Sequence, residues 1–145
     1  MSSSLVLKRA FICIALAMGT IVGGGPWLLY GLGLHGVLGK PQLPSRMATE
    51  VERMDIWHGA RGAGQPSVYR LNPYTYLVSL ADVNARAGRL VAWQVASRYL
   101  QENRRYKGMH WWHLSGAALS VWLTRNWTVD QMLSKLAEEK ATNAA

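Results

Sequence analysis

The sequence predicts an all-α protein in which a single N-terminal transmembrane helix is followed by a small helical domain of four or five helices. Three observations support this fold class. The first 40 residues contain an uncharged stretch long enough to cross a bilayer, and the rest of the chain carries helix start signals and helical hydrophobic spacing. No stretch alternates with the period of two that a half-buried strand requires. We therefore divide the chain into an anchor (1–38), an extended linker (39–48) and a helical domain with a frayed tail (49–145).

The anchor begins with a polar start and the basic pair Lys8 and Arg9, after which no charged residue occurs until Lys40. About 20 apolar residues span a bilayer, so we expect the membrane helix over residues 8–31. A cleaved signal peptide is the alternative interpretation, but the apolar run is too long and no A-x-A-type site follows it. Pro26 lacks a backbone donor, so a kink or a helix end is expected there.

One face of the anchor helix carries small residues at four-residue spacing, namely Ala15, Gly19 and Gly23. Such a face allows a second membrane helix to approach closely. The basic pair at residues 8–9 favours a cytoplasmic N-terminus, because Lys and Arg near a span are retained on that side. We therefore expect a single-pass protein of the inner (cytoplasmic) membrane whose C-terminal domain is extracytoplasmic.

The domain carries clear helix boundaries. Asn72 is a good N-cap, Pro73 suits a first helical position, and Gly88 suits the residue just after a helix end. A second helix is expected over residues 89–103. The last helix has a full start signature, because Thr128 is followed three residues later by glutamine and preceded by a tryptophan that can pack on the helix.

The segment GMHWWHLSGAALSVWLTRNW holds four of the seven tryptophans of the chain. Its helical part, residues 109–123, is short and contains two histidines and two serines, so a full membrane span is disfavoured. A segment that dips into the membrane stays open as an alternative. We expect this segment to form a buried core helix.

The composition excludes several classes of protein. Half of the 145 residues are hydrophobic and 17% are charged, which excludes a disordered chain. The net charge of +8 fits an anionic partner such as lipid or a phosphate-bearing substrate. Nucleic acid is disfavoured because the arginines are scattered and no nucleic-acid-binding motif occurs. The single Cys13 excludes an intrachain disulfide.

Candidates for catalytic or metal chemistry are few. His110 and His113 are spaced to reach one metal ion from a helix, but zinc requires three or four ligands, so we expect no metal site. No nucleotide-binding or nucleophile motif occurs, and no cofactor is expected. The acidic cluster Glu50, Glu52 and Asp55 precedes an aromatic-histidine step, and a carboxylate there could act as a general base if its pKa were raised.

Two stretches carry a family resemblance. VERMDIWHGARG (51–62) is similar to the motif E-D-x-x-F-x-x-H-x-G of the peptidoglycan glycosyltransferases, and NARAGRLVAWQVASRYL (84–100) is similar to a later basic stretch of that family. The resemblance implies a lysozyme-like helical fold with Glu52 as the catalytic base. Arg53 replaces the motif aspartate, His58 lies one position early, and the G-G-S-T segment is missing. The chain therefore resembles a degenerate relative of that family.

Two functional hypotheses follow. The favoured one is a non-catalytic, membrane-anchored accessory subunit of a membrane or cell-envelope complex, with membrane lipids and other membrane proteins as partners. Its candidate contact residues are Ala15, Gly19, Gly23, Trp57, Trp111 and Trp112. The alternative is a glycosyltransferase-related protein that binds or processes an anionic lipid-linked glycan. Its candidate residues are Glu52 for catalysis and Arg86, Arg89, Gln94, Arg98 and Lys107 for substrate binding.

Overall fold

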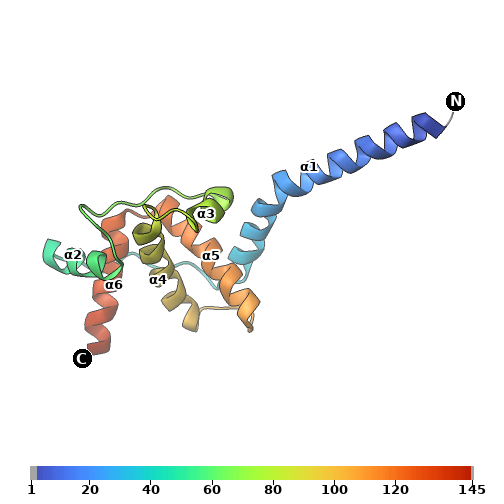
Figure 1. Ribbon diagram of the computed structural model, residues 1–145. Helices are drawn as coiled ribbons and strands as arrows, with labels where there is room; N and C mark the ends of the chain where they lie inside the picture. Colours follow the sequence, from blue (N-terminus) through green and yellow to red (C-terminus); the bar gives the residue numbers. More distant parts are fainter. Residues whose placement is uncertain (1–2, 145) are drawn as a thin grey trace.

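The structure, a computed structural model, describes residues 3–144 and contains only helices in that range. The six helices, in chain order, are α1 (Ser3–His35), α2 (Glu50–Gly59), α3 (Pro73–Ser79), α4 (Arg86–Glu102), α5 (Met109–Asn126) and α6 (Val129–Ala144). The all-α class and the long apolar N-terminal helix are confirmed. α1 projects from a domain built by the other helices, and the C-terminus lies at the opposite end of the molecule (Figure 1).

The expected count of four or five helices in the domain is slightly off, because the last turns of α1 also belong to the domain. An added Cβ at Gly33 would lie 2.6 Å from the Ala118 Cβ and 2.6 Å from the Leu114 carbonyl oxygen of α5. Gly36 is also buried, and an added Cβ there would meet the Ser115 hydroxyl and the Trp111 ring. Glycine at both positions permits the close approach of α1 and α5, so six helical segments pack together.

The core lies between α4, α5 and α6. The fully buried side chains include Val91 and Leu100 from α4, Leu119 and Leu123 from α5, and Met132 from α6. This burial confirms that the tryptophan-rich segment forms a core helix. Small residues of α4 at positions 92 and 96 are completely buried and keep the backbones of α4 and α5 close together.

The sequence signals for helix starts are confirmed. The Asn72 side chain accepts from the backbone N–H of Thr75, whose hydroxyl accepts from the Asn72 N–H, so a capping box begins α3. At α6 the Gln131 N–H donates to the Thr128 hydroxyl at 3.2 Å, and the Thr128 N–H donates back to the Gln131 side chain at 2.8 Å. Both caps satisfy backbone donors that a helix start leaves without partners.

The expectation that Gly88 follows a helix end is wrong. α3 ends at Ser79, and the Asn84 N–H donates to the Asp82 carboxylate in a local turn that interrupts the helix. Gly88 lies inside α4 and is buried, because an added Cβ would lie 2.8 Å from the Ser67 carbonyl oxygen. The glycine lets the loop before α3 cross directly over α4.

The segment between α1 and α2 is hydrogen-bonded to the domain near both of its ends. The Leu38 N–H donates to the Asn103 carbonyl at 2.7 Å, and the Tyr99 hydroxyl donates to the Leu38 carbonyl at 2.7 Å. Further along, the Ala48 N–H donates to the Ser134 hydroxyl of α6 at 2.9 Å. The predicted extended segment is thus a strap that holds α1 to both sides of the domain.

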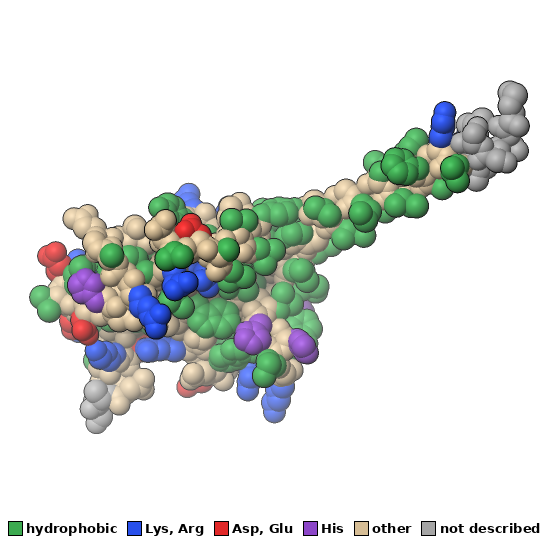
Figure 2. All heavy atoms as spheres, in the orientation of Figure 1, with side chains coloured by type: hydrophobic (Ala, Val, Ile, Leu, Met, Phe, Trp, Pro, Cys, Tyr) green, Lys and Arg blue, Asp and Glu red, His purple; other side chains and the backbone are tan. Residues whose placement is uncertain are grey.

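α1 is the one helix among residues 3–144 that is long and apolar enough to cross a membrane. Its apolar side chains from Leu7 to Leu32 are exposed, and Figure 2 shows them as an almost continuous hydrophobic surface that runs down to the domain. Three acidic residues lie on α2 and three on α6, of eight in the chain. The negative charge is therefore concentrated at the end of the domain away from α1.

Candidate functional site

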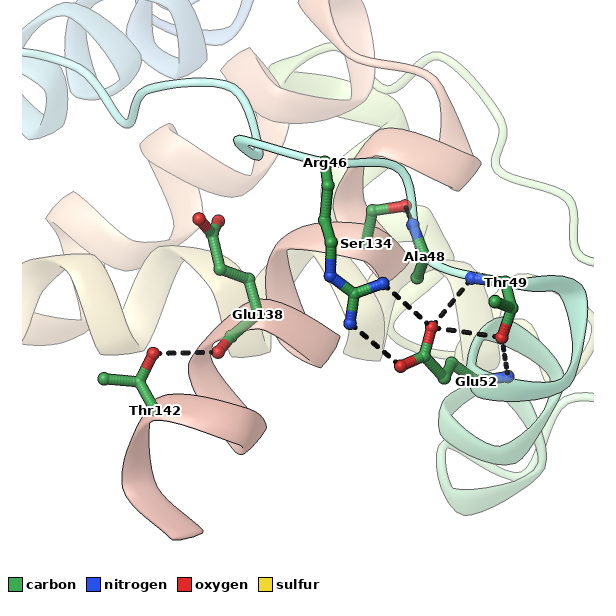
Figure 3. A network of polar contacts seen from close by, with 7 residues as sticks. All are labelled: Arg46, Ala48, Thr49, Glu52, Ser134, Glu138 and Thr142. Carbon is green, nitrogen blue, oxygen red and sulfur yellow. Dashed lines mark hydrogen bonds and ion pairs between the residues drawn. The ribbon is translucent and has the colours of Figure 1, made fainter. Parts of the chain in front are cut away.

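Glu52, the candidate catalytic residue, lies in the first turn of α2 and completes a capping box there (Figure 3). The Glu52 N–H donates to the Thr49 hydroxyl at 3.3 Å, and the Thr49 N–H donates to the Glu52 carboxylate at 2.8 Å. The spacing T-x-x-E brings these two groups together at any helix start. This carboxylate therefore has a structural role, which is to cap the N-terminus of α2.

The Arg46 guanidinium holds the same carboxylate from the other side. Its two terminal nitrogens donate to the two Glu52 oxygens at 3.2 and 3.0 Å, a bidentate ion pair. The hydrogen bonds from Arg46, and then those from the backbone and hydroxyl of Thr49, lower the pKa of Glu52 to about 2. A general base at neutral pH needs a raised pKa, so this environment acts in the opposite direction.

A second carboxylate in the network, that of Glu138 in α6, also has a lowered pKa. It accepts hydrogen bonds from the Ser45 hydroxyl and from Lys135, and these partners lower its pKa, the hydroxyl having the larger effect. Together with the Ala48–Ser134 bond, these contacts tie the strap to α6. Figure 3 shows the strap running past α6 with its polar groups turned toward that helix and toward α2. The network therefore links the strap to α2 and to α6, and we call it the clamp.

Two shallow hollows flank the clamp. One, of about 330 Å³, is lined by Glu52, Asp55 and Lys140, and the other, of about 300 Å³, is lined by Gln94, Arg98 and the same Asp55 and Lys140. The Asp55 and Lys140 side chains form an ion pair at 3.0 Å. Arg98 is paired with a glutamate of α6 at 3.1 Å. The two cations that line these hollows, Lys140 and Arg98, are thus each paired with an acidic neighbour.

The five candidate glycan-binding residues do not lie in one cleft. Arg86 and Arg89 are at the N-terminal end of α4, and the helical rise places Arg98 about 18 Å from Arg86 along the axis. Lys107 lies in the turn between α4 and α5. The structure brings together only Gln94 and Arg98, in the second hollow.

The expectation that Trp57 is an exposed contact residue is wrong. Its side chain is 3% exposed and belongs to the core. An added Cβ at Gly62 would collide with the Trp57 ring, so the loop after α2 closes directly over the indole. The sequence signal for this burial is the glycine-containing loop that follows the tryptophan.

The other two candidate tryptophans are half-buried on α5. The Trp111 ring lies 4.5 Å from the Tyr106 ring, centroid to centroid, and Trp112 packs on the core beneath the Arg104 guanidinium at 5.7 Å. Each ring is therefore only partly exposed at the surface. The third group of candidates, Ala15, Gly19 and Gly23, is exposed on α1, and an added Cβ at either glycine would meet nothing within 4 Å.

An apolar groove lies between α1, α3 and α5, and no sequence pattern indicates it. Its volume is about 140 Å³, and its lining includes Leu29, Tyr76, Leu77, Leu114 and Val121. No charged side chain lines it. It arises where three helices from distant parts of the sequence meet, so no local pattern predicts it.

Tyr74 of α3 contacts α1 at the point where the latter bends. Pro26 has no N–H, so the Val22 carbonyl one turn earlier loses its usual helical partner. The Tyr74 hydroxyl donates to this carbonyl at 3.2 Å and also contacts the Gly23 carbonyl. α3 is therefore attached to the α1 backbone at its proline kink. The sequence indicates through Pro26 that a helix carbonyl loses its partner, but it does not indicate that the Tyr74 hydroxyl replaces that partner.

The histidines provide no metal centre in the described part of the chain. His110 and His113 are both exposed at the start of α5, and His113 stacks on Trp93 with ring centroids 6.1 Å apart. Within residues 3–144, no group of three or more His, Cys, Asp or Glu side chains is placed to hold a metal ion.

Comparison of the chain with protein-family models, with curated proteins and with solved structures gave no match in any of the three. The similarity to peptidoglycan glycosyltransferases therefore rests on the sequence stretches 51–62 and 84–100 alone.

Proposed function

We propose that this protein is a non-catalytic accessory subunit of a membrane or cell-envelope complex, anchored by α1. The observation that carries the proposal is the exposed apolar surface of α1. Its apolar side chains from Leu7 to Leu32 are largely exposed, and burial of such a surface in water-free surroundings is strongly favoured. Lipid or the membrane helices of other proteins would cover it.

The proposed orientation places the N-terminus in the cytoplasm and the domain outside it, in the inner membrane. The basic pair at residues 8–9 supports this orientation. Trp27 and Tyr30 support the position of the other membrane boundary, since their rings contact edge to face at the end of the span and aromatic rings favour that level.

Contact with a membrane partner is proposed along Ala15, Gly19 and Gly23. These residues leave an open, shallow face on α1. Close helix packing in membranes depends on van der Waals contact at such small residues. The exposed parts of Trp111 and Trp112 are the proposed contacts outside the membrane, because tryptophan is enriched at binding hot spots.

The alternative, a glycan-processing relative of the glycosyltransferases, requires Glu52 to accept a proton. Its bidentate pairing with Arg46 and its lowered pKa count against this role. The separation of Arg86 from Arg98 along α4 counts against a shared substrate cleft. The alternative is therefore tested only as one possible result of the experiment described next.

The test is purification of the tagged protein from its own membranes in a mild detergent, with quantitative mass spectrometry of the bound proteins. We expect a membrane protein at a fixed stoichiometric ratio. Gly19→Leu should remove it by filling the small-residue face, whereas the matched variant Ala17→Leu, on the opposite side of the helix, should retain it. Both positions are exposed, so neither change disturbs the domain.

Recovery of the wild-type protein alone would contradict the proposal. The purified protein should then be incubated with lipid-linked glycan. Turnover that is lost in Glu52→Gln would establish the alternative.

A further inference from the structure

The segment from α3 to the start of α4 exposes a cluster of large apolar side chains. The exposed fractions are 58% for Leu77, 70% for Val78, 52% for Leu80 and 68% for Val83. Single apolar residues at a surface are ordinary, but a contiguous group marks a contact site. We name this group, Leu77, Val78, Leu80 and Val83, the α3 patch.

The α3 patch lies next to the membrane helix. The Tyr74 hydroxyl, one turn from Val78, bonds the α1 carbonyls at Val22 and Gly23. Leu77 also lines the apolar groove that α3 shares with α1 and α5. Figure 1 shows α3 on the side of the domain from which α1 departs. The apolar surface of α1 therefore continues onto α3.

The length of α1 fixes the depth of this contact. A rise of 1.5 Å per residue places Trp27 about 28 Å from Lys8, close to the roughly 30 Å thickness of a hydrocarbon core. Gly23 then lies about 6 Å inside the boundary marked by Trp27. Because Tyr74 touches the backbone at Gly23, α3 is held at the level of the lipid headgroups and the first acyl carbons.

The charges beside the α3 patch suit a lipid surface. Arg70 precedes α3 and Arg86 begins α4, and both are exposed and form no ion pair with any of residues 3–144. Basic side chains near a bilayer are attracted to the headgroups of anionic lipid. The one acidic residue of the turn, Asp82, accepts a hydrogen bond from the Asn84 N–H. The positive charge flanking the patch remains in excess.

We propose that the α3 patch is a second membrane contact, in which Leu77, Val78, Leu80 and Val83 insert into the lipid leaflet beside α1 while Arg70 and Arg86 face the headgroups. The inference rests on the proposed anchoring of α1. It adds an interfacial element to the span, so the domain lies against the bilayer with a fixed face instead of hanging from a single helix. Apolar area buried at the interface and attraction to anionic lipid both stabilise such an arrangement.

The test places one environment-sensitive fluorophore on the full-length protein in vesicles of phosphatidylcholine and phosphatidylglycerol. The native thiol is removed by Cys13→Ser, and single cysteines are introduced as Val78→Cys in the patch, Ile14→Cys in the span and Val51→Cys on α2. All three positions are exposed in the structure, Val51 at 80%. Quenching is measured with doxyl-labelled lipid and, separately, with aqueous iodide.

The proposal expects doxyl lipid to quench the probes at positions 78 and 14, with loss of iodide quenching at both, and iodide to quench the probe at position 51. Quenching of position 78 by iodide, with position 14 still quenched by doxyl lipid, would overturn the second contact and leave the anchor intact. Protection of position 78 from both quenchers would overturn it in favour of a protein partner or a second copy. Failure of doxyl lipid to quench position 14 would overturn the anchoring itself.

Discussion

The attachment of α1 to the domain can be tested at Gly33, where α1 and α5 approach most closely. Alanine at this position would place its Cβ 2.6 Å from the Ala118 Cβ and from the Leu114 carbonyl oxygen. Carbon atoms in contact are normally about 3.5–4.0 Å apart, so the two helices would have to separate by about 1 Å. Forcing an extra methyl group into a packed contact costs about 1–3 kcal/mol.

The matched control is Gly31→Ala in the same helix. Gly31 is exposed, and an added Cβ there meets nothing within 4 Å. Both substitutions gain about 0.5–1 kcal/mol of helix propensity, so this gain cancels in the comparison. The difference in unfolding free energy between the two variants is then the packing cost alone, about 1–3 kcal/mol.

Thermal unfolding in detergent micelles, followed by tryptophan fluorescence and circular dichroism, measures this difference. One kcal/mol corresponds to a Tm change of ~4 °C in a domain of this size. We expect Gly33→Ala to unfold at least ~4 °C below Gly31→Ala. Equal Tm values for the two variants would refute the close packing of α1 on α5, and with it the view that α1 is part of the domain.

Three further predictions concern the clamp and the core. Because partners lower the pKa of Glu52 from 4.5 to about 2, its stabilising effect is fully present above pH 4.5 and is lost as the pH falls toward 2. The Tm gap between wild type and Glu52→Gln should close over that range, and a gap that stays constant over it would contradict the pairing of Glu52 with Arg46. Ser134→Ala leaves the buried Ala48 N–H without its acceptor, so it should lower the free energy of unfolding by about 1–3 kcal/mol. Ser134→Thr keeps a hydroxyl and should lie closer to wild type. An unchanged urea midpoint for the alanine variant would contradict the hydrogen bond. Trp57→Ala should cost about 3–5 kcal/mol in the same urea titration, because the ring is buried; a near-neutral result would instead place the ring at the surface.

The sequence predicted features that depend on neighbours along the chain. The caps at Asn72 and Thr128 are of this kind, since donor and acceptor lie within three residues of each other. The same type of signal was present in Thr49-Glu50-Val51-Glu52, which is a capping box. The family resemblance points to Glu52 as a base, whereas the threonine three residues before it indicates a capping carboxylate.

Features that depend on distant segments were not predictable from one sequence. The apolar groove depends on the meeting of α1, α3 and α5. The contact between Tyr74 and the Val22 carbonyl joins residues 52 positions apart. Neither helical spacing nor residue type specifies such pairs.

The strap between α1 and α2 limits the movement of the end of α1 relative to the domain. Its backbone is bonded to the end of α4 near Leu38 and to α6 near Ala48, so the chain that follows α1 is held to the domain at both points. Transmembrane helices commonly tilt by up to about 40°. A change in tilt of about 10° would therefore sweep the far end of a domain roughly 30 Å across through about 5 Å. If α1 spans a membrane as proposed, a small change in its tilt would displace the acidic end of the domain formed by α2 and α6.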